Sequence, residues 1–326
     1  MNTFLRGLPI SSQVALLFLL VFGVLLLATV ALFTASVRNS GDDEAKTAAI
    51  KDYKSLLKTS WAMCTVFWIG WASGEAGATV LFALVSFFAL REFITLSPTR
   101  RGDHRSLILA FFIVLPLQFT LVGSRRFDLV TVFIPVYAFL ALPVVSALAG
   151  DTHRFLERNA KLQWGIMVCV YGMSHVPALM LLKFPGYSGK NAFLVFFLVL
   201  VVQVCLLIQH LTSRRFALAP STPSVSKSFS WRNWLIAVCV ASLMGGLMAG
   251  LTPFKPAQAV AMAFIACVAG SLGHLVMKAL KRDRGITNWG GQGQSVTGAT
   301  GLLDRVDSLC FAAPVFFHSV RWYFGV

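Results

Sequence analysis

Ten apolar runs constrain this chain more than any other feature of its sequence. Seven of them contain 17 to 22 residues without Asp, Glu, Lys or Arg, which is enough for a helix to cross the roughly 30 Å hydrocarbon core of a bilayer. The strands of a membrane barrel would alternate apolar and polar residues, and these runs do not, so helices are the only spanning option. We therefore predict an all-α fold, a polytopic transmembrane bundle of about ten helices. The runs are residues 14–35, 61–73, 76–90, 107–123, 129–149, 163–182, 192–211, 234–252, 257–277 and 308–320.

The composition excludes a soluble protein. Charged residues make up 13% of the chain, about half of the roughly 25% found in soluble domains. Apolar residues make up 57%, and so few charges could not cover the surface of a soluble fold of this length. The six cysteines lie inside apolar runs without CxxC or Cys/His spacing, which disfavours a zinc or thiol redox site. The formal net charge of +15 then indicates a membrane protein beside anionic lipid, or one that handles an anionic substrate, rather than one that binds nucleic acid.

The distribution of Lys and Arg predicts how the chain is oriented. Five alternate segments between the runs carry 21 of the 28 Lys and Arg residues, and the opposite side carries 7. Because cytoplasmic loops are enriched in these residues, we predict a multi-pass protein of the cell (inner) membrane with both termini outside. The short runs 61–73 and 76–90 could form one bent span or a hairpin, but a single crossing would place the next basic segment on the wrong side, so the charges favour two crossings. The segments predicted to be cytoplasmic are residues 36–60, 91–106, 150–162, 212–233 and 278–307.

Residues suited to phosphate and metal chemistry gather near the C-terminus. A basic run, residues 278–285, ends the ninth apolar run, and positive charges at a membrane surface are ordinary there. The glycine-rich segment that follows is less ordinary, because glycines let a backbone expose N–H groups to phosphates. Asp304 and Asp307 come next and would share one face of a helix, where two carboxylates beside Lys and Arg could hold Mg²⁺ against a phosphate. The alternative is that Asp304, Arg305 and Asp307 only cap the helix and interact with its dipole.

The same stretch resembles a known family. Lys281-Arg282-Asp283, a connecting loop and then Gly301-Leu302-Leu303-Asp304-Arg305-Val306-Asp307-Ser308 are similar to the signature of the phosphatidate cytidylyltransferases, the CDP-diacylglycerol synthases. The run from Phe311 to Phe317 resembles their last span, and Leu90-Arg91-Glu92-Phe93 is a weaker upstream likeness. The resemblance implies a membrane-embedded cytidylyltransferase-like domain over residues 61–326. Residues 1–60 would form an N-terminal anchor helix and a cytoplasmic linker.

The resemblance also implies an activity and a site. The family transfers a cytidylyl group from CTP to phosphatidate, which yields CDP-diacylglycerol and pyrophosphate for phospholipid biosynthesis. The implied cofactor is Mg²⁺, and the implied partners are CTP, phosphatidate and membrane lipid, with no nucleic acid; a homodimer stays open as an assembly. Asp304 and Asp307 would be catalytic and would bind the metal, with Asp283 as a weaker metal candidate. Phosphates would be bound by Lys281, Arg282, Arg305 and Ser226, and the connecting loop would contribute Gly298 and Gly301.

The sequence departs from the family pattern at several polar positions. His274 follows Gly273 where the family has an aspartate, and Lys278 stands where the family has a serine. A neutral imidazole suits Mg²⁺ poorly, because Mg²⁺ prefers oxygen ligands. Two interpretations follow: a CTP-dependent cytidylyltransferase with a reorganised metal site, or a family member without catalysis that binds an anionic lipid or a partner protein. A transporter or channel is a third, less favoured alternative, because the 13 acidic residues lie in loops or at the ends of runs rather than in mid-span.

Overall fold

The described part of the chain is entirely helical apart from its loops. The computed structural model describes residues 10–38, 44–96, 99–184, 187, 190–216, 219–226, 228–289 and 301–325. Within these ranges every regular element is a helix, and the β-type pairing is limited to an isolated bridge between Thr222 and Ser226. The predicted all-α fold is confirmed. The chain divides into two units, Met1–Ala72 and Ser73–Val326, and each is described by itself.

Two long helices form the first unit: α2 (Ile10–Arg38) and α3 (Glu44–Ala72). They run antiparallel, because Lys54 on α3 donates a hydrogen bond to Ser36 whereas Trp61, farther along α3, donates to the earlier residue Thr29. Large apolar side chains of α2 are exposed, with Leu19 at 75%. Such exposure suits a helix whose neighbour is lipid rather than water.

Eight helical segments form the second unit, and three of them pass through a short π-helical stretch. In chain order they are α4 (Gly74–Thr95), η1–α5–η2–α6 (Arg101–Gly123), α7–η3–α8 (Phe127–Ala147), α9–η4–α10 (Phe155–Leu181), α11 (Ala192–Arg215), α12–η5 (Trp231–Leu251), α13 (Pro256–Asp283) and α14 (Leu303–Phe324). The π-helical stretches are η2 (Ala110–Val114), η3 (Phe133–Ala138) and η4 (Met167–Gly172). Pro135 lies inside η3, and a proline shifts the hydrogen-bond pattern of a helix because it has no N–H to donate.

Ten long helical segments therefore exist among the described residues, in agreement with the predicted number. Eight of them are long and apolar enough to cross a membrane, namely the Val21–Arg38 part of α2 and the first seven segments of the second unit. The short runs 61–73 and 76–90 lie on two helices, because α3 ends at Ala72 and α4 begins at Gly74, whose φ of 69° breaks the helical path. The chain is thus a multi-pass membrane protein, while the side on which its termini lie stays a prediction.

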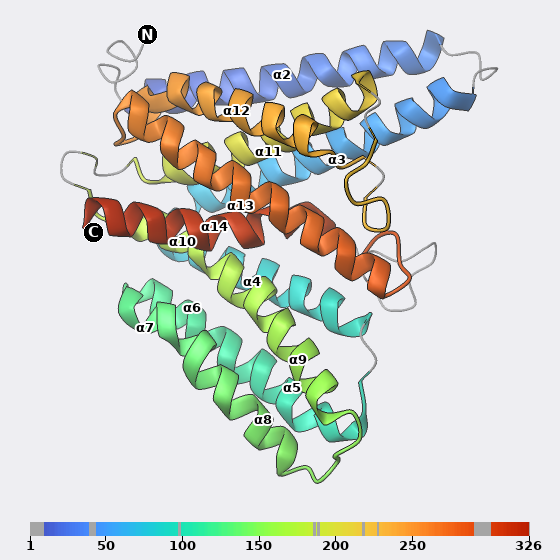
Figure 1. Ribbon diagram of the computed structural model, residues 1–326. Coiled ribbons are helices and arrows are strands. Elements are labelled where there is room, and N and C mark those ends of the chain that lie inside the picture. Colours follow the sequence, from blue (N-terminus) through green and yellow to red (C-terminus); the bar gives the residue numbers. More distant parts are fainter. Residues whose placement is uncertain are drawn as a thin grey trace. The chain divides into compact units, whose positions relative to one another are not determined.

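Glycines allow the C-terminal helix to pack closely against its neighbours. Helices α13 and α14 lie side by side (Figure 1). A Cβ atom at Gly273 of α13 would lie 2.3 Å from the Phe311 side chain of α14. On another face of α14, a Cβ atom at Gly172 of η4 would lie 2.2 Å from the backbone oxygen of Cys310. Residues without a side chain let helix backbones approach in a membrane bundle, so these two glycines set the position of α14.

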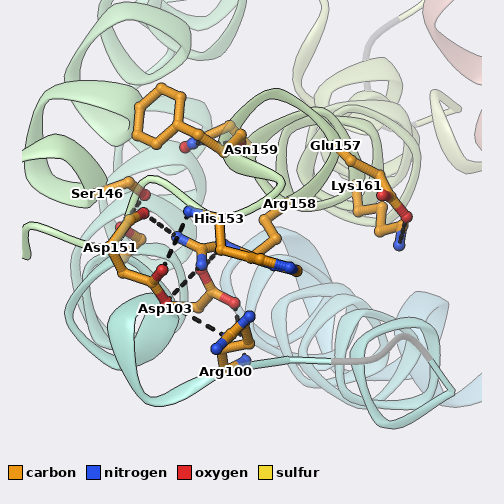
Figure 2. A network of polar contacts seen from close by, with 11 residues as sticks. Arg100, Asp103, Ser146, Asp151, His153, Glu157, Arg158, Asn159 and Lys161 are labelled. Atoms are coloured by element: carbon orange, nitrogen blue, oxygen red, sulfur yellow. Dashed lines mark hydrogen bonds and ion pairs between the residues drawn. The ribbon is translucent and has the colours of Figure 1, made fainter.

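A partly buried network of charges holds the start of α9 to the loops beside it (Figure 2). The guanidinium of Arg158 places Nη1 2.6 Å from Asp151 Oδ2 and Nε 2.9 Å from Asp103 Oδ1. The Nε–H group is not aligned for a hydrogen bond, so the contact with Asp103 is ionic only. Arg100 Nε lies 3.4 Å from the same Asp151 carboxylate. The carboxylates of Asp103 and Asp151 thus balance the guanidinium groups of Arg100 and Arg158. Within this network no net charge remains to attract a ligand.

The pKa of Asp151 responds to this network. Desolvation acts to raise the pKa, but the hydrogen bonds from the His153 N–H group and from Arg158, together with the charges of Arg158 and Arg100, outweigh it. The pKa of Asp151 is therefore lower than that of an isolated aspartate. The ionised form of Asp151 is the one that the fold stabilises.

Candidate functional site

A carboxylate from α4 caps the beginning of α14. Glu92 Oε1 accepts a hydrogen bond from the N–H of Leu302 at 3.0 Å, and Oε2 accepts one from the N–H of Leu303 at 2.8 Å. These groups belong to the first turn of a helix, whose N–H groups have no acceptor within the helix itself. Glu92 is only 4% exposed, and its negative charge lies at the positive end of the α14 dipole. The cap joins two elements that are about 210 residues apart in the sequence.

Asp304, in the first turn of α14, is held by two groups that follow the apolar part of α13. Lys281 Nζ lies 2.6 Å from Asp304 Oδ1, and the backbone N–H of Trp289 donates to Oδ2 at 2.7 Å. The buried indole ring of Trp289 stacks on Phe93, with ring centroids 5.5 Å apart. Burial raises the pKa of the Asp304 carboxyl above its ordinary value, although Lys281 and the Trp289 N–H act in the opposite direction. Lys281 and Asp304, both predicted site residues, are thus direct partners.

Asp307 lies one turn farther along α14 and is almost fully buried. Its Oδ2 atom lies 2.8 Å from His274 Nδ1 on α13, and its Oδ1 atom accepts the N–H of Ser308 at 2.5 Å. The side chain of Asp307 is 3% exposed, against 23% for Asp304. When Asp307 is ionised its carboxylate can only accept, and Nδ1 of His274 is then the donor in this pair. The charge of Asp307 is therefore met by a ring nitrogen from the neighbouring helix.

The remaining predicted residues near α14 lie farther from these contacts. Arg282 is exposed at the end of α13. Asp283 has a side chain that is 70% exposed, and its nearest charged partner is Arg284 at 3.6 Å. Arg305 is half-buried and follows Asp304 on α14. Asp283 is thus placed in solvent, and Arg282 and Arg305 lie beside the site without forming its centre.

The predicted loop residues have separate locations. Ser226 is buried in the connection between α11 and α12, where its Oγ lies 3.3 Å from the Oγ of Ser228. Among the described residues, Ser226 has no hydrogen bond or ion pair with the acidic residues of α14. Gly301 precedes α14 and has a φ of 72°, a conformation that favours glycine. Gly298 lies outside the described residues.

The two α14 carboxylates do not fit Mg²⁺ as the protein holds them. Both oxygens of Asp304 and both oxygens of Asp307 accept hydrogen bonds from protein groups. Mg²⁺ needs near-octahedral oxygen ligands at about 2.0–2.1 Å, whereas an ammonium, an imidazole and two backbone N–H groups contact these four oxygens. Within the described ranges, no group of three or more His, Cys, Asp or Glu side chains is arranged to hold a metal ion. The implied Mg²⁺ stays a prediction.

The sequence as a whole decides the family. It matches the cytidylyltransferase family over residues 54–323. The chain belongs to the cytidylyltransferase family. It is also similar to the Uncharacterized protein YnbB of Escherichia coli (strain K12), with 31% identity over 269 residues that cover 82% of this chain and 86% of YnbB. The matched region of this cytidylyltransferase-family protein includes α4, α13 and α14, so all three helices of the site belong to the family domain.

Two residues of the site had no role in the sequence analysis. Glu92 was included only in a weak upstream likeness, and His274 was noted only as a departure from the family pattern. Both are polar residues within or at the end of apolar helices, and such residues in a membrane bundle usually have a partner. That rule marks them as residues that need a partner, but it does not identify Leu302, Leu303 or Asp307 as the partners. The contribution of Trp289 comes from its backbone, for which the sequence carries no signal.

Proposed function

We propose that this cytidylyltransferase-family protein transfers a cytidylyl group from CTP to the phosphate of phosphatidate at the start of α14. The observation that carries the proposal is the contact of Lys281 with Asp304 at 2.6 Å, at the end of the long apolar helix α13. The end of a membrane helix lies where both a lipid headgroup and a water-soluble nucleotide can approach, and the exposed Arg282 follows Lys281 there. Membership of the family supports the nature of the reaction.

The reaction is a displacement at phosphorus. A phosphate oxygen of the lipid forms a bond to the α-phosphorus of CTP, the bond from that phosphorus to the oxygen bridging to the β-phosphorus breaks, and pyrophosphate leaves with the electron pair. Catalysis of such reactions rests on positioning and on neutralising the phosphate oxygens. Lys281 would neutralise the negative charge of the phosphate oxygens. Asp304 is a positioning residue that fixes the Lys281 ammonium. Arg305 and Arg282 would bind the outer phosphates.

The proposed site faces the cytoplasm. CTP is a cytoplasmic nucleotide, so the segment from Lys278 to Asp307 would face the cytoplasm, with both termini on the outer side of the cell membrane. The concentration of 21 of the 28 Lys and Arg residues in five alternate segments supports this orientation. Cysteine labelling of single sites in each loop of intact cells would measure it directly.

The activity can be tested with purified protein in lipid nanodiscs that contain phosphatidate. CTP labelled at the α-phosphate is added with and without Mg²⁺, and labelled lipid and pyrophosphate are both quantified. We expect one pyrophosphate for each CDP-diacylglycerol formed, and no labelled lipid in nanodiscs made of phosphatidylcholine alone. A protein that binds CTP but forms no product at any Mg²⁺ concentration would contradict the transfer reaction.

A second function is favoured by a different observation, the pairing of His274 with Asp307 at 2.8 Å. Since this pair occupies a carboxylate that could otherwise hold a metal, we propose as the alternative a family member without catalysis that binds an anionic lipid. Native mass spectrometry would then show a co-purified anionic phospholipid, and His274→Asp alone would not produce activity. Growth of a strain depleted of its main synthase, rescued by the native chain, would exclude this alternative.

A further inference from the structure

Three side chains that carry or can carry positive charge lie on one face of α13. His274, Lys278 and Lys281 are separated by four and three residues, which places them on the same side of a helix. The first contacts Asp307 and the last contacts Asp304, so this face is turned toward α14. The three residues span about 10 Å along the helix axis. We call them the cationic face of α13.

Lys278, the central member of the cationic face, has no assigned role and no direct partner among the described residues. It is half-buried, and the charges of both Asp307 and Lys281 act on its ammonium group. Within the described part of the chain it makes neither a hydrogen bond nor an ion pair. Its three N–H donors are therefore available to a ligand, and partial burial without a partner is unfavourable for an ammonium group. An anion beside Lys278 would remove that cost.

The backbone N–H groups at the start of α14 are not available to bind such an anion. Helix N-termini often bind phosphate through their free N–H groups, but Glu92 already accepts hydrogen bonds from Leu302 and Leu303. The capping carboxylate would also repel a phosphate that approached the same N–H groups. In the described part of the chain, an anionic ligand at this end of the bundle must therefore be neutralised by side chains, and the cationic face is one group of side chains placed to do so.

We propose that Lys278 binds a phosphate group directly, with His274 and Lys281 on either side of it, and that this binding does not require a divalent ion. The ligand class is a phosphate monoester or a pyrophosphate group, which both phosphatidate and CTP carry. The inference deepens the proposed function, because it concerns the same site and names the groups that neutralise the substrate. The reason is the pairing of the side chains. His274 contacts Asp307 and Lys281 contacts Asp304, whereas Lys278 contacts neither aspartate directly.

Binding measured without turnover tests this inference. The purified full-length protein in detergent micelles is titrated separately with CTP and with phosphatidate, in EDTA and in Mg²⁺, and phosphatidylcholine serves as a lipid without a phosphate monoester. We expect at least one of the two phosphate ligands to bind with a Kd that changes less than threefold between EDTA and Mg²⁺. The separate titrations show whether the phosphate belongs to the nucleotide or to the lipid.

Variants of matched charge identify the residue. Lys278→Met should weaken binding in EDTA by about ten- to a hundredfold, the usual value of a hydrogen bond to a charged group, while Lys278→Arg should stay within about threefold. Lys255→Met is the control, because Lys255 precedes the opposite end of α13 and is exposed. Melting curves of all variants show whether each one is folded.

Each outcome has a separate meaning. Binding in EDTA that is lost in Lys278→Met and kept in Lys278→Arg and Lys255→Met supports the inference. Binding that occurs only with Mg²⁺, or that is unchanged in a folded Lys278→Met protein, overturns the inference and leaves the proposed function intact. If neither CTP nor phosphatidate binds under any condition, both the inference and the proposed function are wrong.

Discussion

Nδ1 of His274 lies 2.8 Å from Oδ2 of Asp307, so a histidine from α13 faces the more buried of the two aspartates of α14. The pair changes the chemical character of the site. A carboxylate with free oxygens would attract a metal ion, whereas Oδ2 of Asp307 is already in contact with a ring nitrogen of His274. The neighbouring contact of Lys281 with Asp304 has the same form. Both acidic residues therefore hold basic side chains of α13 in place.

Asp304→Asn tests the positioning of Lys281. The amide keeps the shape of the carboxylate but removes the charge that holds the ammonium, and its NH₂ group must face one of two donors, Lys281 or the Trp289 N–H. We expect transfer from CTP to fall by about a hundredfold or more, as when a charge-stabilising group is lost from an active site. The rate of pyrophosphate release measures the effect. Asp128→Asn is the control, because Asp128 is 92% exposed; equal activity of the two variants would refute the role of Asp304.

Glu92→Gln tests the cap on α14. A glutamine has one acceptor oxygen, so one of the two N–H groups of Leu302 and Leu303 would lose its partner. We expect the free energy of unfolding to fall by about 1–3 kcal/mol, the cost of leaving a buried polar group unpaired. The melting temperature of the solubilised protein gives the measurement. Glu75→Gln removes only a partly exposed contact with Arg125 and should cost less than about 1 kcal/mol.

Arg158→Met tests the network of Figure 2. The change leaves the Asp103 carboxylate with Arg100, and the Asp151 carboxylate with Arg100 and the His153 N–H. Removing one partner of a buried ion pair costs about 3–5 kcal/mol. We expect the lower end of that range, because Asp151 is 26% exposed. Chemical unfolding followed by tryptophan fluorescence would measure the loss. The control is Lys161→Met, which removes a contact with Glu157 four residues earlier on the same helix. It should cost no more than about 0.5 kcal/mol. An equal loss of stability in both variants would show that the Arg158 network stabilises the fold no more than this helix-surface contact does.

Acid should weaken the network through Asp151. The pKa of Asp151 is lower in the folded protein than the value of about 3.9 for an unfolded chain. Between these two values the unfolded chain binds more protons, so stability falls as the pH decreases through this window. The stabilising effect of Asp151 should be complete above about pH 5 and decline below about pH 4. Melting temperatures of native protein and Asp151→Asn should therefore converge on acidification, and a constant difference down to pH 3 would disprove the assignment.

Gly172→Ala tests the packing of α14 against η4. The new Cβ atom would lie 2.2 Å from the backbone oxygen of Cys310, and backbone cannot move aside as a flexible side chain can. We expect a loss of about 1–3 kcal/mol or more in the free energy of unfolding. Gly23→Ala offers the same chemical change on α2, where nothing lies within 4 Å, and there alanine should leave stability equal or slightly higher. A stable Gly172→Ala protein would mean that α14 has another position available.

The helices could be predicted because their signal is local. A run such as residues 192–211 is long and apolar by itself, and it forms most of α11 (Ala192–Arg215). The spacing of Asp304 and Asp307 likewise places both on one side of α14 without knowledge of the rest of the fold. Local periodicity also links Lys278 and Lys281 on α13. These predictions need only the geometry of one helix.

The contacts that build the site could not be predicted, because they join distant parts of the chain. Nothing near Glu92 indicates that its carboxylate reaches Leu302 and Leu303. The orientation of His274 toward Asp307 depends on how closely α13 approaches α14, which in turn depends on Gly273 and Phe311. Packing decides these distances, and packing is a property of the assembled bundle.

The cap that Glu92 places on α14 has a consequence for the order in which the protein is made. Synthesis proceeds from the N-terminus, so α4 enters the membrane long before the ribosome reaches Leu302. During that interval the Glu92 carboxylate, near the end of α4, has no helix end to receive it. Nascent chains that stop before α14 would leave this carboxylate without the N–H groups of Leu302 and Leu303. The bundle can therefore reach its final state only after its last helix has been translated.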